Sequence, residues 1–202
     1  MSNNALIIFT RNPELGKCKT RLAKTIGDQE ALNVYKFLLQ HTANVAKKVK
    51  SSRYVYYSVK IRDNDIWDKT LFNKKQQFGE DLGIRMQNAF QELFNLGHEK
   101  VIIIGSDLLD LSTEIIEEAY KKLDTNDAVI GPAEDGGYYL LGFKKPTPEV
   151  FNIKNWGTET VYKQTLEKLI SKKVYVLETL NDIDYVEDLK PYPRFTSYFK
   201  TS

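Results

Sequence analysis

Four cationic side chains fall within eleven residues, directly after the first apolar run of this sequence. The run at residues 5–9 is long enough for a β-strand and too short for a buried helix. Pro13 and Gly16 then predict a loop, and its cations are Arg11, Lys17, Lys19 and Arg21. A strand end that offers basic side chains and free backbone N–H groups suits a phosphate. The segment therefore predicts a site for a phosphate-bearing ligand, with a solvated basic loop as the alternative.

Two aspartates follow predicted strands and could hold a metal ion. Asp107 comes just after the β-branched run 101–104, at the carboxyl end of a strand, where open α/β sheets bind ligands. Carboxylates and substrate phosphates are the ligands that Mg²⁺ or Mn²⁺ takes. Asp184 follows the last strand and could complete the site. The alternatives are a turn role for Asp107 and a helix-capping role for Asp184 at residues 185–189.

The segment 131–142 concentrates glycine, acidic and aromatic residues between two strand-like runs. Asp135-Gly136-Gly137 at that position predicts a hairpin turn. A turn alone does not explain why Glu134 and Tyr138 lie beside it. Because two glycines also let a backbone approach a ligand closely, a turn and a ligand contact both remain open.

Alternating helices and strands position these segments. Period-2 or continuous apolar runs predict strands at residues 5–9, 53–59, 101–104, 128–130, 138–143 and 174–177. Amphipathic spacing predicts helices at residues 28–49, 82–94, 112–123 and 158–170, with Asp28, Ser112 and Thr158 as caps and Gly97 as a stop. Residues 63–73 stay ambiguous and 191–202 irregular. The pattern indicates an α/β fold with a mostly parallel sheet and helices on both faces.

Composition limits the function classes. The chain has 202 residues, 42% hydrophobic and 28% charged, which fits one globular domain over 1–202. Its 29 basic and 27 acidic residues balance to +2, so it does not resemble a protein that coats nucleic acid. We expect no membrane span and no signal peptide. The single cysteine, Cys18, forms no internal disulfide, in line with a cytoplasmic location.

Four segments occur in order along the chain. They are Thr-Arg-Asn-Pro-Glu-Leu-Gly-Lys-Cys-Lys-Thr-Arg-Leu at 10–22, Gly-Glu-Asp-Leu-Gly-Ile-Arg-Met at 79–86, Gly-Ser-Asp at 105–107 and Gly-Pro-Ala-Glu-Asp-Gly-Gly-Tyr-Tyr-Leu-Leu-Gly at 131–142. Together they resemble a bacterial glycosyltransferase-like family of unknown function, itself similar to 2-phospho-lactate guanylyltransferases. The resemblance runs from about residue 5 to 189. It implies a GT-A type fold, a single Rossmann-like domain with a mixed sheet that binds a nucleotide and a divalent metal.

The resemblance also implies roles for individual residues. The residues of its nucleotide-phosphate loop correspond to Arg11, Lys17, Lys19 and Arg21, and its metal-binding strand ends at Asp107. The segment that would face the acceptor is Asp135, Gly136, Gly137 and Tyr138. The late acidic motif is Asp182 and Asp184. One departure matters, because the family usually has Cys-Pro where this chain has Leu108-Leu109. Without the proline, we expect a looser turn after Asp107.

Three functions fit these residues. The leading interpretation is a metal-dependent glycosyltransferase-like enzyme that uses a nucleotide-sugar and a small acceptor. The basic loop and Mg²⁺ or Mn²⁺ would neutralise the leaving group, and Asp135 or Glu134 would act as the general base. The close alternative is a nucleotidyltransferase that takes a nucleoside triphosphate and releases pyrophosphate. A non-catalytic nucleotide-binding protein is the third possibility.

Overall fold

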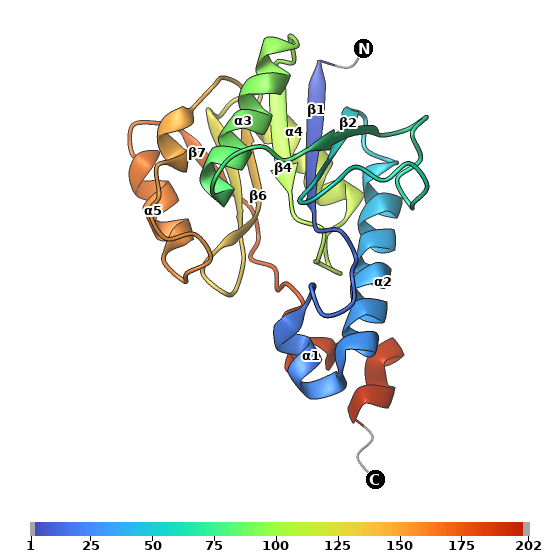
Figure 1. The fold of residues 1–202 in the computed structure, drawn as a ribbon. Helices are drawn as coiled ribbons and strands as arrows, with labels where there is room; N and C mark the ends of the chain where they lie inside the picture. The colour runs from blue at the N-terminus through green and yellow to red at the C-terminus, as the bar shows by residue number, and fades with distance from the viewer. Residues whose placement is uncertain (1–2, 200–202) are drawn as a thin grey trace.

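A seven-stranded sheet with helices on both faces organises residues 3–199, the part of the chain that the computed structural model describes (Figure 1). The strand order is β3-β2-β1-β4-β6-β5-β7. Their bounds are β1 Asn4–Thr10, β2 Ser52–Tyr57, β3 Asn73–Gln76, β4 Lys100–Ile104, β5 Ala128–Pro132, β6 Tyr138–Phe143 and β7 Val174–Val176. Only β6 pairs antiparallel to its neighbours. The predicted mostly parallel α/β fold is therefore confirmed.

Alternating side chains of the strands supply two cores, one on each face. Leu6 and Ile8 of β1 face a core shared with α2 (Asp28–Ala46) and α4 (Thr113–Lys122). Ala5 and Ile7 face the other core, with α3 (Leu82–Asn95) and α5 (Val161–Lys168). This two-residue period is what a strand buried on both faces requires.

Several local predictions need correction. The segment after β1 is not a loop throughout, because α1 (Thr20–Ile26) begins at Thr20 and carries Arg21. Thr158 does not cap α5, which begins three residues later behind Thr160. Asp28 does not cap α2 either, because it is the first residue of that helix and Gly27 occupies the cap position. The Ser112 cap is confirmed, since its hydroxyl accepts the Ile115 N–H.

Other elements were missed. Polar strand β3 lies at the sheet edge, where half-exposed Lys and Asn side chains hide any apolar alternation. A 3₁₀ helix at Val186–Leu189 matches the short helix considered at residues 185–189, whereas two further 3₁₀ helices were not foreseen, at Pro148–Phe151 and Pro193–Phe199. The last one covers part of the region predicted to be irregular, and it packs Phe195 into the first core; residues 200–202 lie outside the described part.

The sheet brings the chemically suggestive segments to one edge. Strand order reverses between β1 and β4, and such a switch point opens a crevice beyond the carboxyl ends of the strands. Because β6 runs antiparallel to β4, the hairpin before Tyr138 reaches the same edge, where the Gly105 N–H donates to the Tyr139 carbonyl. The segment after β7 returns there as well, since Leu180 pairs with Ala133.

Candidate active site

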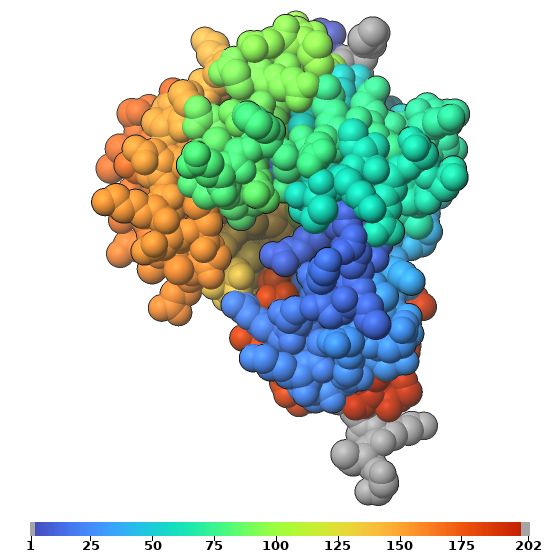
Figure 2. Space-filling view, in the orientation of Figure 1, coloured from blue at the N-terminus to red at the C-terminus, as the bar shows by residue number. Residues whose placement is uncertain are grey.

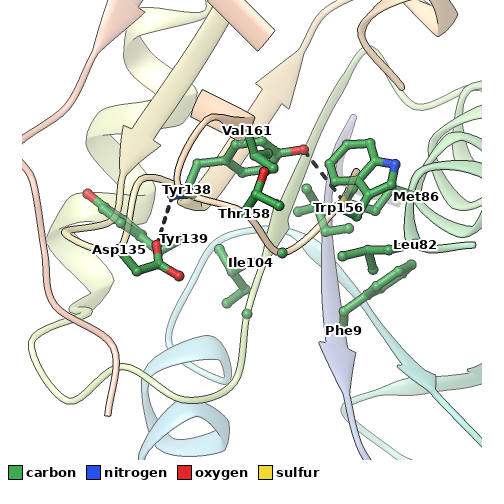
Figure 3. A pocket seen from close by; sticks show the side chains of 14 residues that line it. Phe9, Leu82, Met86, Ile104, Asp135, Tyr138, Tyr139, Trp156, Thr158 and Val161 are labelled. Carbon is green, nitrogen blue, oxygen red and sulfur yellow. Dashed lines mark hydrogen bonds between the residues drawn. The ribbon is translucent and has the colours of Figure 1, made fainter. Parts of the chain in front are cut away.

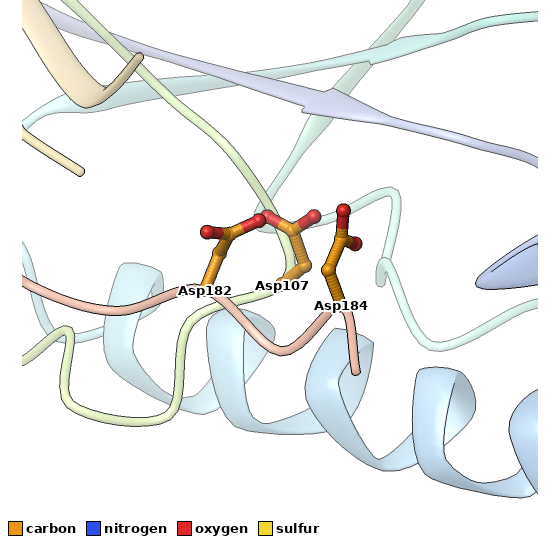
Figure 4. A group of neighbouring side chains, drawn as sticks. All are labelled: Asp107, Asp182 and Asp184. Atoms are coloured by element: carbon orange, nitrogen blue, oxygen red, sulfur yellow. The ribbon is translucent and has the colours of Figure 1, made fainter. Parts of the chain in front are cut away.

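Three aspartates converge at this edge (Figure 4). Asp107 lies just beyond β4, and Asp182 and Asp184 lie on the segment after β7. One carboxylate oxygen of each lies within 4.8 Å of those of the other two. The Ile183 N–H donates to the Asp107 carbonyl at 3.2 Å, which holds the two segments together. The structure thus brings together the two predicted metal ligands and adds Asp182.

Lys19 is the central cation of this cluster. Its ammonium donates to Asp107 Oδ2 and Asp184 Oδ1, each at 2.8 Å, and its side chain is only 5% exposed. The residue adopts the left-handed conformation (φ 49°, ψ 45°), and among the described residues it is the one non-glycine with positive φ. Such a conformation costs about 1–2 kcal/mol in a residue with a Cβ, so the surrounding contacts must stabilise it. Lys19 is therefore not part of a solvated loop.

Arg21 lies at the rim of the cluster. Its Nη1 donates to Asp184 Oδ2 at 3.0 Å, and its guanidinium lies over the Tyr185 ring, 5.6 Å from the ring centre. The side chain is 52% exposed. Since this hydrogen bond uses one of its five N–H groups, the guanidinium retains donors for a ligand.

The other two predicted phosphate ligands, Arg11 and Lys17, form no ion pair with these aspartates in the described part of the chain. Lys17 is 74% exposed and pairs with Glu14 at 3.0 Å. Arg11 is exposed at the end of β1, where its backbone N–H donates to the Tyr35 hydroxyl. The buried Cys18 fills space in the first core, and burial raises the pKa of its thiol, which argues against a nucleophile.

The segment around Asp184 differs from one sequence-based alternative. The Asp184 carboxylate does not cap Val186–Leu189; it binds Lys19 and Arg21. Asp188 instead accepts the backbone N–H groups of Asp184 and Tyr185. The pair Leu108-Leu109, where the resemblance leads one to expect Cys-Pro, packs on the first core, with Leu108 buried and Leu109 partly buried. The turn after Asp107 is thus anchored by packing rather than by proline.

The two late aspartates have opposite pKa shifts. Burial raises the pKa of Asp184, but the Lys19 ammonium and the Arg21 guanidinium outweigh it and hold that pKa below its ordinary value. Burial, with the nearby Asp107 charge, raises the pKa of Asp182 to about 7. Among the described residues, none donates a hydrogen bond to the Asp182 carboxylate or pairs with it, so its charge remains poorly compensated.

We expect Asp182→Asn to stabilise the metal-free protein at pH 8. A carboxyl whose folded pKa lies above its unfolded pKa contributes stability at low pH that is lost as the pH rises through about 7. The amide removes that penalty, by about 1–3 kcal/mol given the partial exposure of the side chain. Thermal melts in EDTA at pH 4 and pH 8 measure it, and no gain at pH 8 would contradict the assignment.

Asp184→Asn is the matched control, two residues away. Because the pKa of Asp184 is lowered in the fold, its charge contributes stability at neutral pH that disappears as the pH falls through the lowered pKa. The same chemical change at this position should therefore lower the melting temperature at pH 8.

A cavity of about 210 Å³ opens beside the cluster. Figure 2 shows the hollow on this face, with yellow atoms of the β5–β6 region at its floor between green, orange and blue segments. Its walls include Phe9, Met86, Ile104, Tyr138 and Trp156, as Figure 3 shows. Gly105 of the β4 end also lines it, and so joins the cavity to the turn that carries Asp107.

The sequence reasoning missed most of these wall residues. Trp156, for example, packs on the second core and also lines the cavity. A usable signal was Gly83 in the segment 79–86, because any Cβ there would collide with the Trp156 ring and the Phe151 carbonyl. A glycine inside an amphipathic helix thus indicated a close approach.

The predicted acceptor segment forms the turn between β5 and β6. Asp135 and Gly137 line the cavity, and Asp135 Oδ1 accepts the Gly137 N–H at 2.8 Å. Gly136 has φ +85° and its carbonyl accepts the Tyr162 N–H, so the hairpin prediction is confirmed. Glu134 is exposed and does not line the cavity.

Comparison with known proteins identifies the family. Residues 41–158, more than half of the chain, match the family described as "Uncharacterized protein conserved in bacteria (DUF2064)". The chain belongs to this family. A crystal structure from Desulfovibrio desulfuricans G20, provisionally assigned as a nucleotide-diphospho-sugar transferase, is 34% identical over 100% of this chain and 92% of its own, with a TM-score of 0.88. The family resemblance is thereby confirmed.

More distant structures share the fold. A cytidylyltransferase from Leptospira borgpetersenii is 15% identical, over 100% of this chain and 89% of its own, with a TM-score of 0.65. A 4-diphosphocytidyl-2C-methyl-D-erythritol synthase from Anaerococcus prevotii is 14% identical, over 99% and 97%, with a TM-score of 0.62. A search of curated proteins found no match. These structures share the fold of the 34% identical protein, which confirms the predicted nucleotide-diphosphosugar transferase type of fold.

None of the helices in the described part of the chain combines the length and apolarity needed to cross a bilayer.

Proposed function

We propose that this family member is a metal-dependent transferase that takes a nucleotide-linked donor and glycosylates the hydroxyl of a small acceptor. The observation that carries the proposal is the cluster of Asp107, Asp182 and Asp184 with Lys19 and Arg21, set at the switch point of the sheet beside a cavity. Acidic and basic groups placed together are what a metal-bound diphosphate needs on its two sides.

The donor set fits Mg²⁺ or Mn²⁺. An octahedral ion with ligands at about 2.1 Å spans up to roughly 4.2 Å between opposite oxygens, close to the 4.8 Å within which the three carboxylate oxygens lie. Asp107 and Asp184 would hold the ion, with Asp182 as the third ligand. Bound there, it would supply charge neutralisation of the leaving group.

Lys19 and Arg21 would then bind the donor diphosphate. The Lys19 ammonium lies 2.8 Å from two of the carboxylates, so a phosphate oxygen bound beside the cluster would compete with these two carboxylates for the ammonium. Arg21 has free N–H groups that can bind two phosphate oxygens at once. Arg11 and Lys17, exposed on the same segment, would contact the outer part of the donor.

Asp135 is the general base of this proposal. One of its oxygens accepts the Gly137 N–H, and its side chain lines the cavity, whereas Glu134 does not. In the transfer step the acceptor hydroxyl oxygen bonds to the sugar carbon and its proton passes to Asp135. The carbon–oxygen bond to the diphosphate breaks, and its electron pair leaves with the nucleoside diphosphate. Gly136, Gly137 and Tyr138 would frame the acceptor.

Nucleotidyl transfer is the second candidate. It is favoured by the fold that the chain shares with the cytidylyltransferase and the 4-diphosphocytidyl-2C-methyl-D-erythritol synthase described above. In that reaction the acceptor attacks the α-phosphorus of a nucleoside triphosphate and pyrophosphate leaves. Incubation with panels of nucleotide-sugars and nucleoside triphosphates plus Mn²⁺ separates the two. Nucleoside diphosphate release supports glycosyl transfer, pyrophosphate release supports the second candidate, and binding without turnover would overturn both.

We expect Arg21→Lys to weaken nucleotide binding about tenfold while the protein folds normally. A lysine keeps the charge and loses the two-pronged geometry, a loss typical of bidentate phosphate sites. Calorimetry with a nucleoside diphosphate and Mn²⁺ measures it. Lys24→Ala, which removes an exposed cation from the last turn of the same helix, is the control and should change little. Equal affinities of both variants and the wild type would contradict a phosphate role for Arg21.

A further inference from the structure

The cavity beside the acidic cluster is almost devoid of charge. Fourteen residues line it, and of these only Asp135 is ionisable at neutral pH; none is Lys, Arg or His. Its volume is about 210 Å³. A cavity of about 150 Å³ with apolar walls can hold a benzene molecule, so this one has room for a ring with a short substituent.

Its polar groups are mostly engaged elsewhere. The Tyr139 hydroxyl donates to the Glu178 carbonyl at 3.0 Å, and the Thr158 hydroxyl donates to the Asn155 carbonyl at 3.1 Å. Tyr138 donates only to the Met86 sulfur, 3.8 Å away, a weak acceptor that a ligand oxygen could replace. The Trp156 Nε1–H also lacks a partner in the described part of the chain, but it is buried against Gly83 of α3. The side-chain groups left for a ligand are thus the Tyr138 hydroxyl and the second oxygen of Asp135.

We infer that this cavity is the acceptor site and that the acceptor is a hydroxyl compound with an apolar body and no negative charge. The inference rests on the proposed function and names its substrate class. One hydroxyl is enough to use both available groups, because it can donate to Asp135 and accept from Tyr138. The rest of the acceptor would meet Phe9, Met86 and Ile104.

Charge excludes the anionic alternative. A carboxylate or phosphate in the cavity would meet Asp135 with no lining cation to compensate it. The cations of the site, Lys19 and Arg21, are held by aspartates outside the lining. Burying an unpaired anion there is costly.

A nucleobase is also a poorer occupant. Its edge carries several donors and acceptors, and each one left unpaired in an apolar cavity weakens binding. The walls offer it only the two available side-chain groups. A body with one polar substituent matches the lining better.

Two small probes with the same ring test the inference. We expect 2-phenylethanol to bind the nucleotide-free protein, measured by saturation-transfer NMR, and phenylacetate to bind at least about tenfold more weakly. Cytidine and guanosine should not displace the alcohol. Equal or tighter binding of phenylacetate, no binding of the alcohol, or displacement by either nucleoside would overturn the inference.

Charge variants on one helix locate the effect. Leu82 lies at the start of α3 and lines the cavity. Leu96 is also exposed, but it follows the other end of α3 and does not line the cavity. Leu82→Lys should reduce the preference for alcohol over phenylacetate severalfold, because it supplies the missing cation. Leu96→Lys should leave the preference unchanged. Equal effects of the two would place the probe elsewhere and overturn the inference.

This result is separable from the proposed function. If the alcohol binds as expected but no nucleotide binds with Mn²⁺, the transferase proposal fails while the chemistry of the cavity stands. If nucleotide binds and the alcohol preference is absent, only the acceptor class is wrong.

Discussion

Replacing Lys19 by methionine should make the metal-free protein less stable and yet improve its binding of Mn²⁺. The ammonium compensates Asp107 and Asp184 at 2.8 Å each and is almost fully buried, so its loss leaves three facing carboxylates. Breaking such a pair on one side costs about 2–3 kcal/mol when the partners remain partly exposed. In a domain of this size that lowers the melting temperature by roughly 5–10 °C.

Mn²⁺ should reverse that loss. A divalent ion competes with the Lys19 ammonium for the same carboxylate oxygens in the wild type, and it has no such competitor in Lys19→Met. We therefore expect Mn²⁺ alone to raise the melting temperature of the variant more than that of the wild type. Nucleotide affinity in the presence of Mn²⁺ should fall, because a phosphate ligand is gone.

Lys17→Met is the matched control. It removes the same charge two residues earlier, from a side chain that is 74% exposed and paired only with Glu14. We expect it to change neither stability nor Mn²⁺ binding by more than about 0.5 kcal/mol. If Lys19→Met binds Mn²⁺ no more tightly than the wild type, then Lys19 does not compete with a metal ion for the aspartate oxygens, and the proposed metal site is wrong.

The second large effect concerns the hairpin beside the cavity. Gly136→Ala should destabilise the protein by about 3–5 kcal/mol. Its φ of +85° disfavours any Cβ, and an added methyl would overlap the backbone of Glu159 just before α5. Because the Gly136 carbonyl also accepts the Tyr162 N–H, the hairpin and α5 would have to separate. Thermal unfolding should show a drop of roughly 10 °C.

Gly137→Ala tests the contact between the hairpin and a ligand separately from the stability of the hairpin. The nearest atom to its added methyl is Asp135 Oδ1 at 3.1 Å, an end that can adjust, so little stability should be lost. Since Gly137 lines the cavity, the same methyl should weaken 2-phenylethanol binding. If Gly136→Ala melts like the wild type, the close approach of hairpin and α5 described here is wrong.

Local physics accounts for the features that the sequence alone determined. The β-branched run 101–104 and its neighbours specify strands through a two-residue period, and alternation with amphipathic helices specifies the α/β class. Parallel strands share a carboxyl edge, so Asp107 was placed correctly at that edge. Ser112 was recognised as a cap because capping acts within one turn of helix.

Only the tertiary structure decided what those residues contact. Lys19 looked like a loop cation, and its partners Asp107 and Asp184 lie 88 and 165 positions away. Asp184 was predicted as a metal ligand or a helix cap, and neither pattern indicated that a guanidinium and an ammonium from the far end of the chain bind it. The cavity is assembled from β1, α3, β4, β6 and the residues before α5. A one-dimensional pattern specifies which residues share a face within an element, whereas the partners across elements depend on how the sheet is ordered, and that order is set by packing over the whole domain.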